Sequence, residues 1–544
     1  MDDQVEMLPG TSRLFEDHAH AAISHLKRDG DVVLAPQPTE SPNDPLNWSL
    51  PRKYLHAILL FFVAGFTAGT ANDAGSAQDG MNAEYGISYD VMNTGAGVLF
   101  IGIGYWTFLV SPAASLYGRR VPYLIGMTWG LIGAIWMSKV RNASDSIWNQ
   151  LFVGASESAA EANVQLSLSE IFFEHQRGSV IGIYVFATSI GTYLGPLIAA
   201  YVADRLGWRW IGWLSVIISA CTIVVLYFGL EETMFDRAAH VTTDGAQSSS
   251  NTTGPIASGD VSDSEKATAR GWIQRSPSDV IGADDKPKTY WQRIQIITLA
   301  PNVKGTGFKQ YVSRLWHTLR IFGFPAVIYS GIQWGAQDAW LTFYITLEQD
   351  NWYGAPWFYS TIGTGLMNVP CIIGAIVGCF WGGYMSDRFV FWMAKRRNGI
   401  REAEDRLWMM LPCAVCSPGG MLIFGIGTAY GWAWPAPYVG LGLIGFGWGC
   451  AGDLSMAYLM DAYPEMVLEG MVGVSVINNS IGCIFTFTAS TWLANSGVRD
   501  CFIALSVLDF FFIALTVPMV VYGKACRRWT LTRYLNFVKI RDSI

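Results

Sequence analysis

The chain has 544 residues, of which 51% are hydrophobic and only 15% are charged. A soluble protein carries about a quarter charged residues, so this composition indicates several membrane-spanning segments and excludes an ordinary soluble globular protein. The formal net charge of −7 gives no sign of a nucleic-acid partner, because the lysines and arginines gather in particular loops, where they set membrane topology.

The first half of the chain begins with a polar tail and continues as a series of apolar segments. Residues 1–50 contain several prolines and show no sustained apolar period, which predicts a mostly disordered tail without a secretory signal peptide. Segments close to the ~20 apolar residues that cross a bilayer then follow at 54–75, 89–112, 121–139, 147–172, 178–203 and 209–230. We therefore predict a bundle of six transmembrane helices over residues 51–232.

A polar linker separates this bundle from a second set of apolar segments. The linker, 233–320, is rich in Ser, Thr, Gly and Asp at first and then mixes basic with aromatic residues, which predicts short helices along the membrane surface. Apolar segments resume at 321–346, 357–384, 408–428, 436–461, 470–494 and 501–523. This predicts a second six-helix bundle over 321–524 and a tail over 525–544. Two equal halves around a soluble loop are typical of secondary transporters.

The positive charges predict which side of the membrane each loop faces. Counted span by span, the clusters Arg52-Lys53, Arg119-Arg120, Lys395-Arg396-Arg397 and Arg527-Arg528 fall on one side, whereas the loops at 76–88, 348–356 and 429–436 carry no lysine or arginine. The basic side is the cytosolic one, so we predict that both tails and the linker are cytosolic. Asn142, in the sequon Asn142-Ala143-Ser144, then lies in an outer loop and is a predicted glycosylation site.

Two glutamates interrupt the fourth apolar segment. Glu157 and Glu161 are one helical turn apart and therefore share a helix face. An ionisable side chain at membrane depth costs several kcal/mol unless it faces a cavity or a partner, so both are candidate functional residues. A helix contact is the alternative for Glu157. Most of the nine cysteines lie in apolar runs, and the Cys413/Cys416 pair lacks a second pair or a histidine, so we predict no metal site.

The fifth apolar segment carries the most specific motif, Gly191-x-x-x-Gly195-Pro196-x-x-Ala199-Ala200. Small residues let helices approach closely and proline frees a carbonyl, which gives a hinge, with ordinary helix packing as the alternative. The motif resembles the G-x-x-x-G-P-x-x-G-G motif of the major facilitator superfamily, in particular the fungal 12-helix drug:proton antiporter branch that includes polyamine and cation transporters. Further stretches similar to this branch are SLSEIFFEHQRGSVIGIY, MSDRFVFWMAKRRNGIREAEDRLW and GDLSMAYLMDAYPE.

The resemblance implies an all-α membrane protein whose two six-helix bundles rock around a central cavity, working as a monomer with a proton gradient and no cofactor. Two family motifs are altered. In the loop after the second span, Ser111, Ser115 and Leu116 replace the usual Gly, Asp and Arg and leave Gly118-Arg119-Arg120. A more complete gating motif, ending in Asp387-Arg388, follows the eighth span. The fourth span has Gln150 where the family often has the arginine linked to proton coupling.

The resemblance also implies that spans one, four, seven and ten line the central cavity. Their predicted substrate- and proton-binding residues are Asp73; Glu157, Glu161 and Gln165; Gln333, Trp334 and Asp338; and Asp453 and Tyr458. All four spans carry carboxylates and none of these positions is lysine or arginine, which favours a cationic or proton-coupled cargo. Asp73, near the end of its span, could instead be interfacial.

These features predict a transporter of the cell membrane or, alternatively, of the vacuolar membrane. Proton-driven export of a drug or fungal secondary metabolite is the first hypothesis, and proton-coupled uptake of polyamines or other organic cations is the second. A sensor on the same scaffold that does not transport is a third. An intramembrane enzyme is disfavoured, because all seven histidines fall in tails, loops or span edges and no H-E-x-x-H or G-x-S-x-G motif is present.

Overall fold

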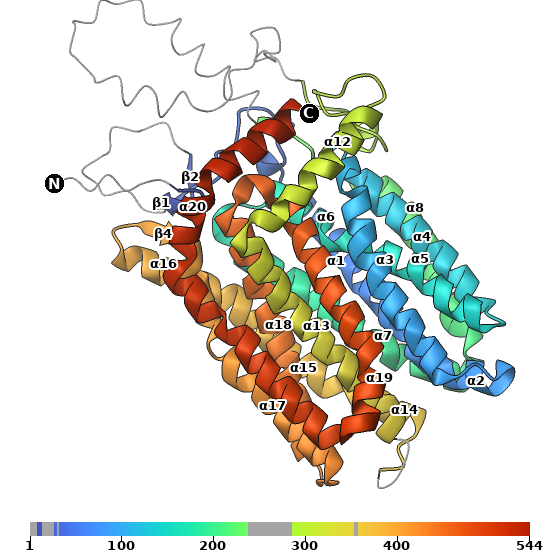
Figure 1. Cartoon of the computed structure of the whole chain (residues 1–544). Coiled ribbons are helices and arrows are strands. Elements are labelled where there is room, and N and C mark those ends of the chain that lie inside the picture. The colour runs from blue at the N-terminus through green and yellow to red at the C-terminus, as the bar shows by residue number, and fades with distance from the viewer. Residues whose placement is uncertain (1–7, 14–26, 30–31, 238–285, 353–356) are drawn as a thin grey trace, which may run out of the picture.

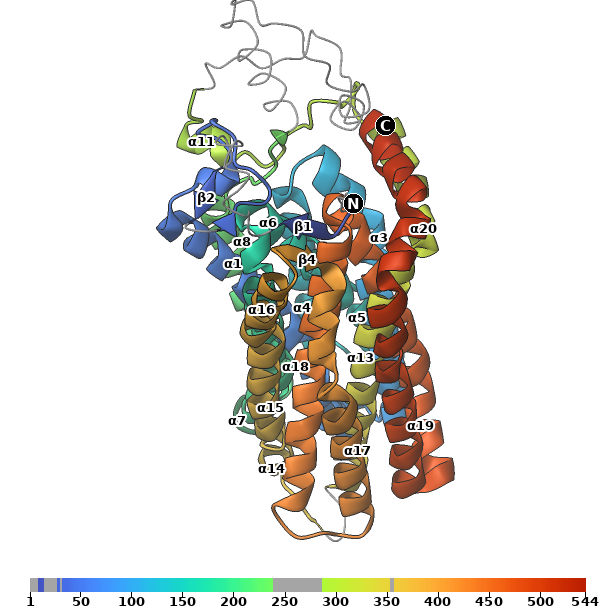
Figure 2. The same ribbon diagram turned by 90° about the vertical axis from the view of Figure 1, so that its left-hand side faces the viewer.

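The computed structural model describes residues 8–13, 27–29, 32–237, 286–352 and 357–544. They form two bundles of long helices that stand side by side, the first drawn from blue to green and the second from yellow to red (Figure 1). The bundles meet along two seams. At one seam α3 (Tyr89–Leu116) packs against α19 (Val467–Ala514), and at the other α7 (Arg177–Leu206) packs against α15 (Asn368–Phe380) and α18 (Ala436–Ala462). Strand β1 and the end of α20 lie at the same end of the molecule, here called the terminal face; the opposite end is the far face (Figures 1 and 2).

The first bundle consists of α1 (Leu50–Asn72), α2 (Gln78–Tyr85), α3 (Tyr89–Leu116), α4 (Arg120–Ser138), α5 (Ala143–Glu161), α6 (Asn163–Ile171), α7 (Arg177–Leu206) and α8 (Arg209–Gly229). The predicted fourth span is thus two helices, because the backbone leaves the helical region at Ala162 (φ −131°, ψ −33°). The break comes directly after Glu161, and such discontinuous helices are common at transporter binding sites.

The second bundle consists of α13 (Pro325–Asn351), α14 (Thr361–Gly365), α15 (Asn368–Phe380), α16 (Ser386–Arg396), α17 (Cys413–Ala429), α18 (Ala436–Ala462), α19 (Val467–Ala514) and α20 (Thr516–Ser543). A π-helical turn, Trp381–Met385, joins α15 to α16. The long α19 is two helices that turn back on each other at Gly497, whose φ of 74° suits glycine. The predicted C-terminal tail is largely the continuation of α20.

The prediction of a disordered N-terminal tail is wrong for the described parts of that tail. Strand β1 (Thr11–Arg13) pairs antiparallel with β4 (Ile400–Glu402), in the loop after α16. Arg527 of α20 donates a hydrogen bond to the carbonyl of Pro9 at 2.5 Å, and Leu8 is buried. Residues 8–13 are ordered because the second bundle supplies partners that the local sequence does not reveal.

Of the linker, the structure describes residues 233–237 and 286–320; its predicted Ser/Thr-rich part, 238–285, lies outside the described residues. The short helices α11 (Tyr290–Arg293) and α12 (Phe308–Thr318) follow. Phe308 and Trp316 are each 70% exposed, so α12 presents aromatic rings outward at the terminal face. That is the pattern expected of a helix lying on a bilayer.

Within the described residues, eight helical segments are long and apolar enough to cross a membrane. Three long helices are not among them, α5, α13 and α18, and these three carry Glu157, Glu161, Asp338 and Asp453. Their greater polarity fits a position between the other helices, where they face protein or a cavity rather than lipid.

Candidate functional site

Three carboxylates from the two bundles meet near the centre of the molecule. Glu157 and Glu161 come from α5 and Asp338 comes from α13; all three are partly exposed. Asp338 is close enough to both glutamates for like-charge repulsion, and among the described residues no lysine or arginine offsets these charges. This group, the central carboxylates, is therefore open to a cation or to protons.

Neighbouring helices hold the central carboxylates in place. Gly154 lets α5 approach α3 so closely that a Cβ at this position would lie 2.3 Å from the carbonyl oxygen of Leu99. On the second bundle, Trp448 of α18 donates its indole N–H to Asp338 at 2.9 Å. Trp334 packs against Trp448, and Tyr193 of α7 meets the other side of Trp448, with ring centroids 4.6 and 6.2 Å apart. An aromatic cluster from both bundles thus adjoins the acidic group.

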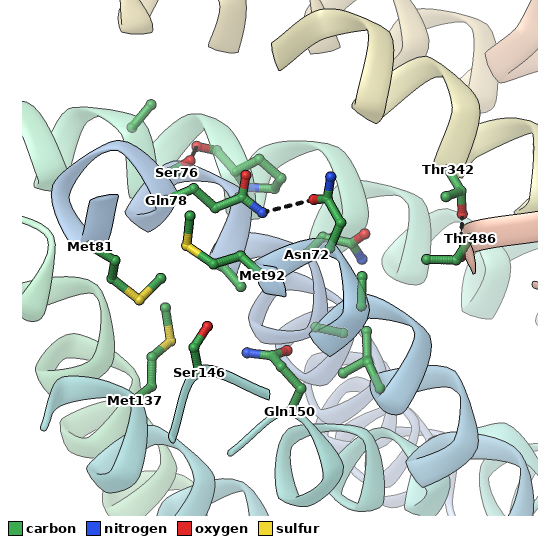
Figure 3. A pocket seen from close by; sticks show the side chains of 18 of the residues that line it. Asn72, Ser76, Gln78, Met81, Met92, Met137, Ser146, Gln150, Thr342 and Thr486 are labelled. Carbon is green, nitrogen blue, oxygen red and sulfur yellow. Dashed lines mark hydrogen bonds between the residues drawn. The ribbon is translucent and has the colours of Figure 1, made fainter. Parts of the chain in front are cut away.

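A cavity of about 160 Å³ opens between the bundles toward the far face. Its lining combines amides, hydroxyls and methionines from both bundles, among them Asn72, Gln78, Met81, Met92, Met137, Gln150, Thr342 and Thr486 (Figure 3). Gln150 precedes Glu157 by seven residues on α5, about 10 Å of helix rise, and Thr342 follows Asp338 by four residues, about 6 Å. The cavity therefore leads from the far face toward the central carboxylates.

The other predicted cavity residues lie elsewhere. Asp73 is buried within the first bundle, where Ser215 donates to it at 3.4 Å, and Gln333 donates to the carbonyl of Phe512 within the second. Tyr458 is buried against Tyr329, also inside the second bundle.

Gln165 contacts the sulfur of Met456 across the seam at 3.8 Å. Asp453 is fully buried at the seam between α7 and α18. Helix position alone was not sufficient to place these side chains.

At the terminal face, Asp387 joins the two bundles. Its carboxylate accepts hydrogen bonds from the backbone N–H and the hydroxyl of Ser179, at the start of α7, at 2.7 and 2.8 Å. Within its own bundle it accepts a bond from Arg406 at 3.0 Å, and Arg406 also pairs with Asp461. Arg177 adds a second link between the bundles by donating to the carbonyl of Met460 at 3.3 Å.

Arg388, the other member of the predicted gating motif, takes no part in this link. It is exposed and lies over the ring of Tyr384 at 5.1 Å. Successive helical residues point about 100° apart, so Asp387 faces the seam while Arg388 faces away from it. The basic partner of Asp387 is Arg406, which the sequence motif does not mark.

The shortened motif Gly118-Arg119-Arg120 makes its hydrogen bonds within the first bundle and the linker. Arg119 pairs with Glu170 at 2.7 Å, and Arg120 donates to the carbonyls of Tyr227 and Gln295. Gly118 has a φ of 108°, and a Cβ there would lie 2.5 Å from a carboxylate oxygen of Glu232. Burial raises the pKa of Glu232, although the backbone N–H of Arg119 donates to it.

The glycine motif of α7 forms a tight contact with α1. A Cβ at Gly191 would lie 1.9 Å from the carbonyl oxygen of Gly65, and one at Gly195 would lie 2.7 Å from Gly69. Pro196, inside α7, accepts a hydrogen bond from Ser76 through its carbonyl at 3.1 Å. The predicted glycosylation residue Asn142 is exposed at the start of α5, where its side chain accepts the backbone N–H of Asp145.

Comparison with known proteins identifies the family of this architecture. The family model described as Major Facilitator Superfamily matches residues 57–487. The chain belongs to the major facilitator superfamily. Like other major facilitator proteins it is a multi-pass membrane transporter and not an enzyme. The structure of the proton:xylose symporter XylE has the same fold, with a TM-score of 0.57 and 12% identity over 87% of this chain and 96% of that one.

Two fungal major facilitator relatives align with the whole chain. An uncharacterized MFS-type transporter, C1271.10c, of Schizosaccharomyces pombe is 52% identical over 100% of this chain and 96% of its own. Protein HOL1 of Saccharomyces cerevisiae is 48% identical over 100% of this chain and 99% of its own. These matches confirm the fungal branch to which the sequence motifs point.

The sequence left three features of the structure unresolved. Strand β1, at residues 11–13, pairs with residues 400–402, a separation in the chain that no local pattern signals. Arg406 stands among other charges of one loop and could not be singled out. Asp509 is buried in the second bundle, where it accepts hydrogen bonds from Gln337 and Trp340 at 2.8 and 2.7 Å. An isolated aspartate in an apolar segment marks such a residue but does not name its partners.

Proposed function

We propose that this transporter moves organic cations of the polyamine class across the cell membrane by alternating access, in exchange for protons. One observation carries the proposal: Glu157, Glu161 and Asp338 come together from separate bundles without a basic partner among the described residues. They lie one to two helical turns from Thr342 and Gln150, which line the cavity. The distribution of lysine and arginine supports a cytosolic terminal face and a cavity that opens to the outside.

Electrostatics favours a cation with more than one ammonium group. Carboxylates gathered at membrane depth repel one another and lose hydration, which costs several kcal/mol unless positive charge or protons compensate them. A linear amine with two or more charges can contact acids from both bundles at once. Its methylene chain suits the amide and methionine lining of the cavity, because methionine adapts to apolar ligands.

Sharing one acidic group couples the cargo to protons. A carboxylate that holds a proton no longer attracts an ammonium group, so the site binds either a proton or the cation, but not both. Each transport cycle therefore exchanges the cation for protons. Across a cell membrane that is acidic outside, this exchange drives the cation outward. Uptake by symport, the alternative direction, needs a proton site outside the central carboxylates.

Flux measurements in proteoliposomes test both the cargo and the direction. Purified protein is reconstituted, the membrane potential is clamped with potassium and valinomycin, and radiolabelled spermidine is the probe. Exchange predicts accumulation into vesicles with an acidic interior, whereas symport predicts accumulation from an acidic exterior. The Glu161→Gln variant should lose the pH-driven component. Absence of flux under both gradients, or equal flux in Glu161→Gln, would refute the proposal.

A second candidate, export of an uncharged amphipathic drug or metabolite, draws support from the cavity itself. Most of its lining side chains are uncharged amides, hydroxyls and methionines, with Asp79 as an acidic exception. A hydrophobic dye with no charge, tested in the same vesicles, separates the two candidates: its transport should survive Glu161→Gln if the cavity lining alone selects cargo.

A further inference from the structure

Asp453 is a buried carboxylate that the central site does not use. It lies on α18 with 0% exposure, and neither of its carboxylate oxygens has a hydrogen-bond partner among the described residues. Trp448, one and a half turns earlier on the same helix, donates to Asp338 of the central carboxylates, but Asp453 itself points toward α7 and the π-helical turn.

Three glycines from both bundles make the space for this carboxylate. A Cβ at Gly182 of α7, at Gly382 or at Gly383 would come within 2.9 to 3.0 Å of one oxygen of Asp453. Gly382 and Gly383 belong to the π-helical turn, and such turns frequently mark functional sites in helices. The carboxylate is therefore enclosed by the second bundle on one side and by the first bundle on the other.

The charged groups around Asp453 are already engaged elsewhere. Arg406 acts on it through space but makes its ion pairs with Asp387 and Asp461, and Asp387 adds like charge. Among the described residues, the remaining titratable neighbour is the buried thiol of Cys379 on α15, and the α7 residue next to the carboxylate is Gly182. An ionised, unpartnered carboxylate in this position would pay a large desolvation cost, which a bound proton removes.

Burial of Asp453 depends on the conformation of the transporter. Gly182 lies one turn beyond Ser179, which Asp387 holds against the second bundle at the terminal face. When the bundles part at that face, Gly182 withdraws with α7 and water reaches the carboxylate. Its surroundings thus change between the two states that alternating access requires.

We propose that Asp453 is a proton-binding site separate from the central carboxylates, loaded while the bundles are joined at the terminal face. On opening, the O–H bond breaks and the proton passes to water on that side, leaving the hydrated carboxylate. On closing, a proton from the same side is taken up again. The proposal rests on the alternating-access part of the proposed function and on no particular cargo.

Proton linkage gives the size of the expected effect. If closing at the terminal face takes up one proton, the ratio of closed to open protein falls by up to about tenfold for each unit of rising pH. A cytosol that becomes alkaline would therefore favour the form open to the cytosol. Acid would hold the transporter closed on that side.

Spin-label distances across the terminal face measure this equilibrium without any cargo. Labels are placed on Leu50→Cys at the start of α1 and on Trp392→Cys of α16, both exposed positions, after the partly exposed native cysteines are replaced by alanine. In the labelled protein that keeps Asp453, we expect the population with the short label-to-label distance to shrink as pH rises from 5.5 to 8.5. In Asp453→Asn, which mimics the protonated group, we expect a short distance at every pH.

Two further variants make the outcome decisive. Asp509→Asn changes another buried acid, but one bonded only within the second bundle, and should keep the pH response. Asp453→Ser is smaller than the native residue and should match Asp453→Asn; it replaces that variant if the asparagine disturbs folding. A pH response that persists in both Asp453 variants, or is absent from the unmodified site, would overturn the proposal. Neither result bears on whether spermidine is transported.

Discussion

Asp387→Asn should open the transporter at the terminal face. In the structure this carboxylate caps the start of α7 through two hydrogen bonds from Ser179, at 2.7 and 2.8 Å, and so holds the first bundle against the second. Asparagine has nearly the same shape and keeps an acceptor, but it lacks the charge. The perturbation therefore removes electrostatics from the link while leaving its packing in place.

The structure gives the magnitude of this effect. A hydrogen bond to a charged group contributes about 1.5 to 3 kcal/mol, against about 1 kcal/mol for a neutral one, so two bonds lose about 1 to 4 kcal/mol. The favourable charge at a helix N-terminus adds about 0.3 to 1 kcal/mol. Arg406 and Asp461 belong to the same bundle and keep their ion pair whether the terminal face is closed or open, so the contribution of Arg406 to the closed-to-open free-energy difference largely cancels. A change of about 3 kcal/mol alters the closed-to-open ratio by about 150-fold.

The assay is the spin-label distance between positions 50 and 392. We expect Asp387→Asn to move most of the population to the long distance at neutral pH. The matched control is Arg388→Gln, next in the chain but turned away from the seam, which should leave the distribution unchanged. An unchanged distribution in Asp387→Asn, or equal opening in Arg388→Gln, would refute the reasoning.

Three further predictions concern packing, the tail and topology. Gly191→Ala should destabilise the protein by about 1 to 3 kcal/mol, because its Cβ would overlap the backbone of α1, whereas Gly419→Ala, which has open space around it, should leave the thermal midpoint unchanged. Deleting residues 1–13 removes β1 and its hydrogen bonds and should lower the thermal midpoint; an unaltered midpoint would mean that the strand contributes no stability. Asn142→Gln should abolish any glycosidase-sensitive shift in electrophoretic mobility, and a shift that persists in the variant would place the glycan elsewhere.

The helices could be predicted from sequence because hydropathy over a span is a local property. Each predicted apolar segment lies largely in helix, and the described parts of both long polar stretches add no long helix to the bundles. Local sequence patterns do not predict structure that depends on a partner far away in the chain. Strand β1 is ordered only because β4 offers it an edge, and α5 ends at Glu161 through a break that composition does not reveal.

The helices that carry the candidate site residues could be predicted from the sequence, but the direction in which each side chain points could not. Spacing puts Glu157 and Glu161 on one side of α5, and the structure brings that side to Asp338. The rotation of each helix is set by packing, which the sequence of one chain does not show. Asp73 is therefore turned toward Ser215, and Asp453 toward the glycines of α7 and the π-helical turn.

Spermidine binding with simultaneous proton counting tests most directly whether Glu161 and Asp338 jointly hold the cargo. Titrating purified protein in two buffers of different ionisation enthalpy gives the affinity and the number of protons released together. We expect binding to release protons and to weaken as pH falls, and we expect both effects to vanish in a folded Glu161→Gln/Asp338→Asn variant. Unchanged affinity in that variant, with no protons released from the native protein, would contradict the assignment.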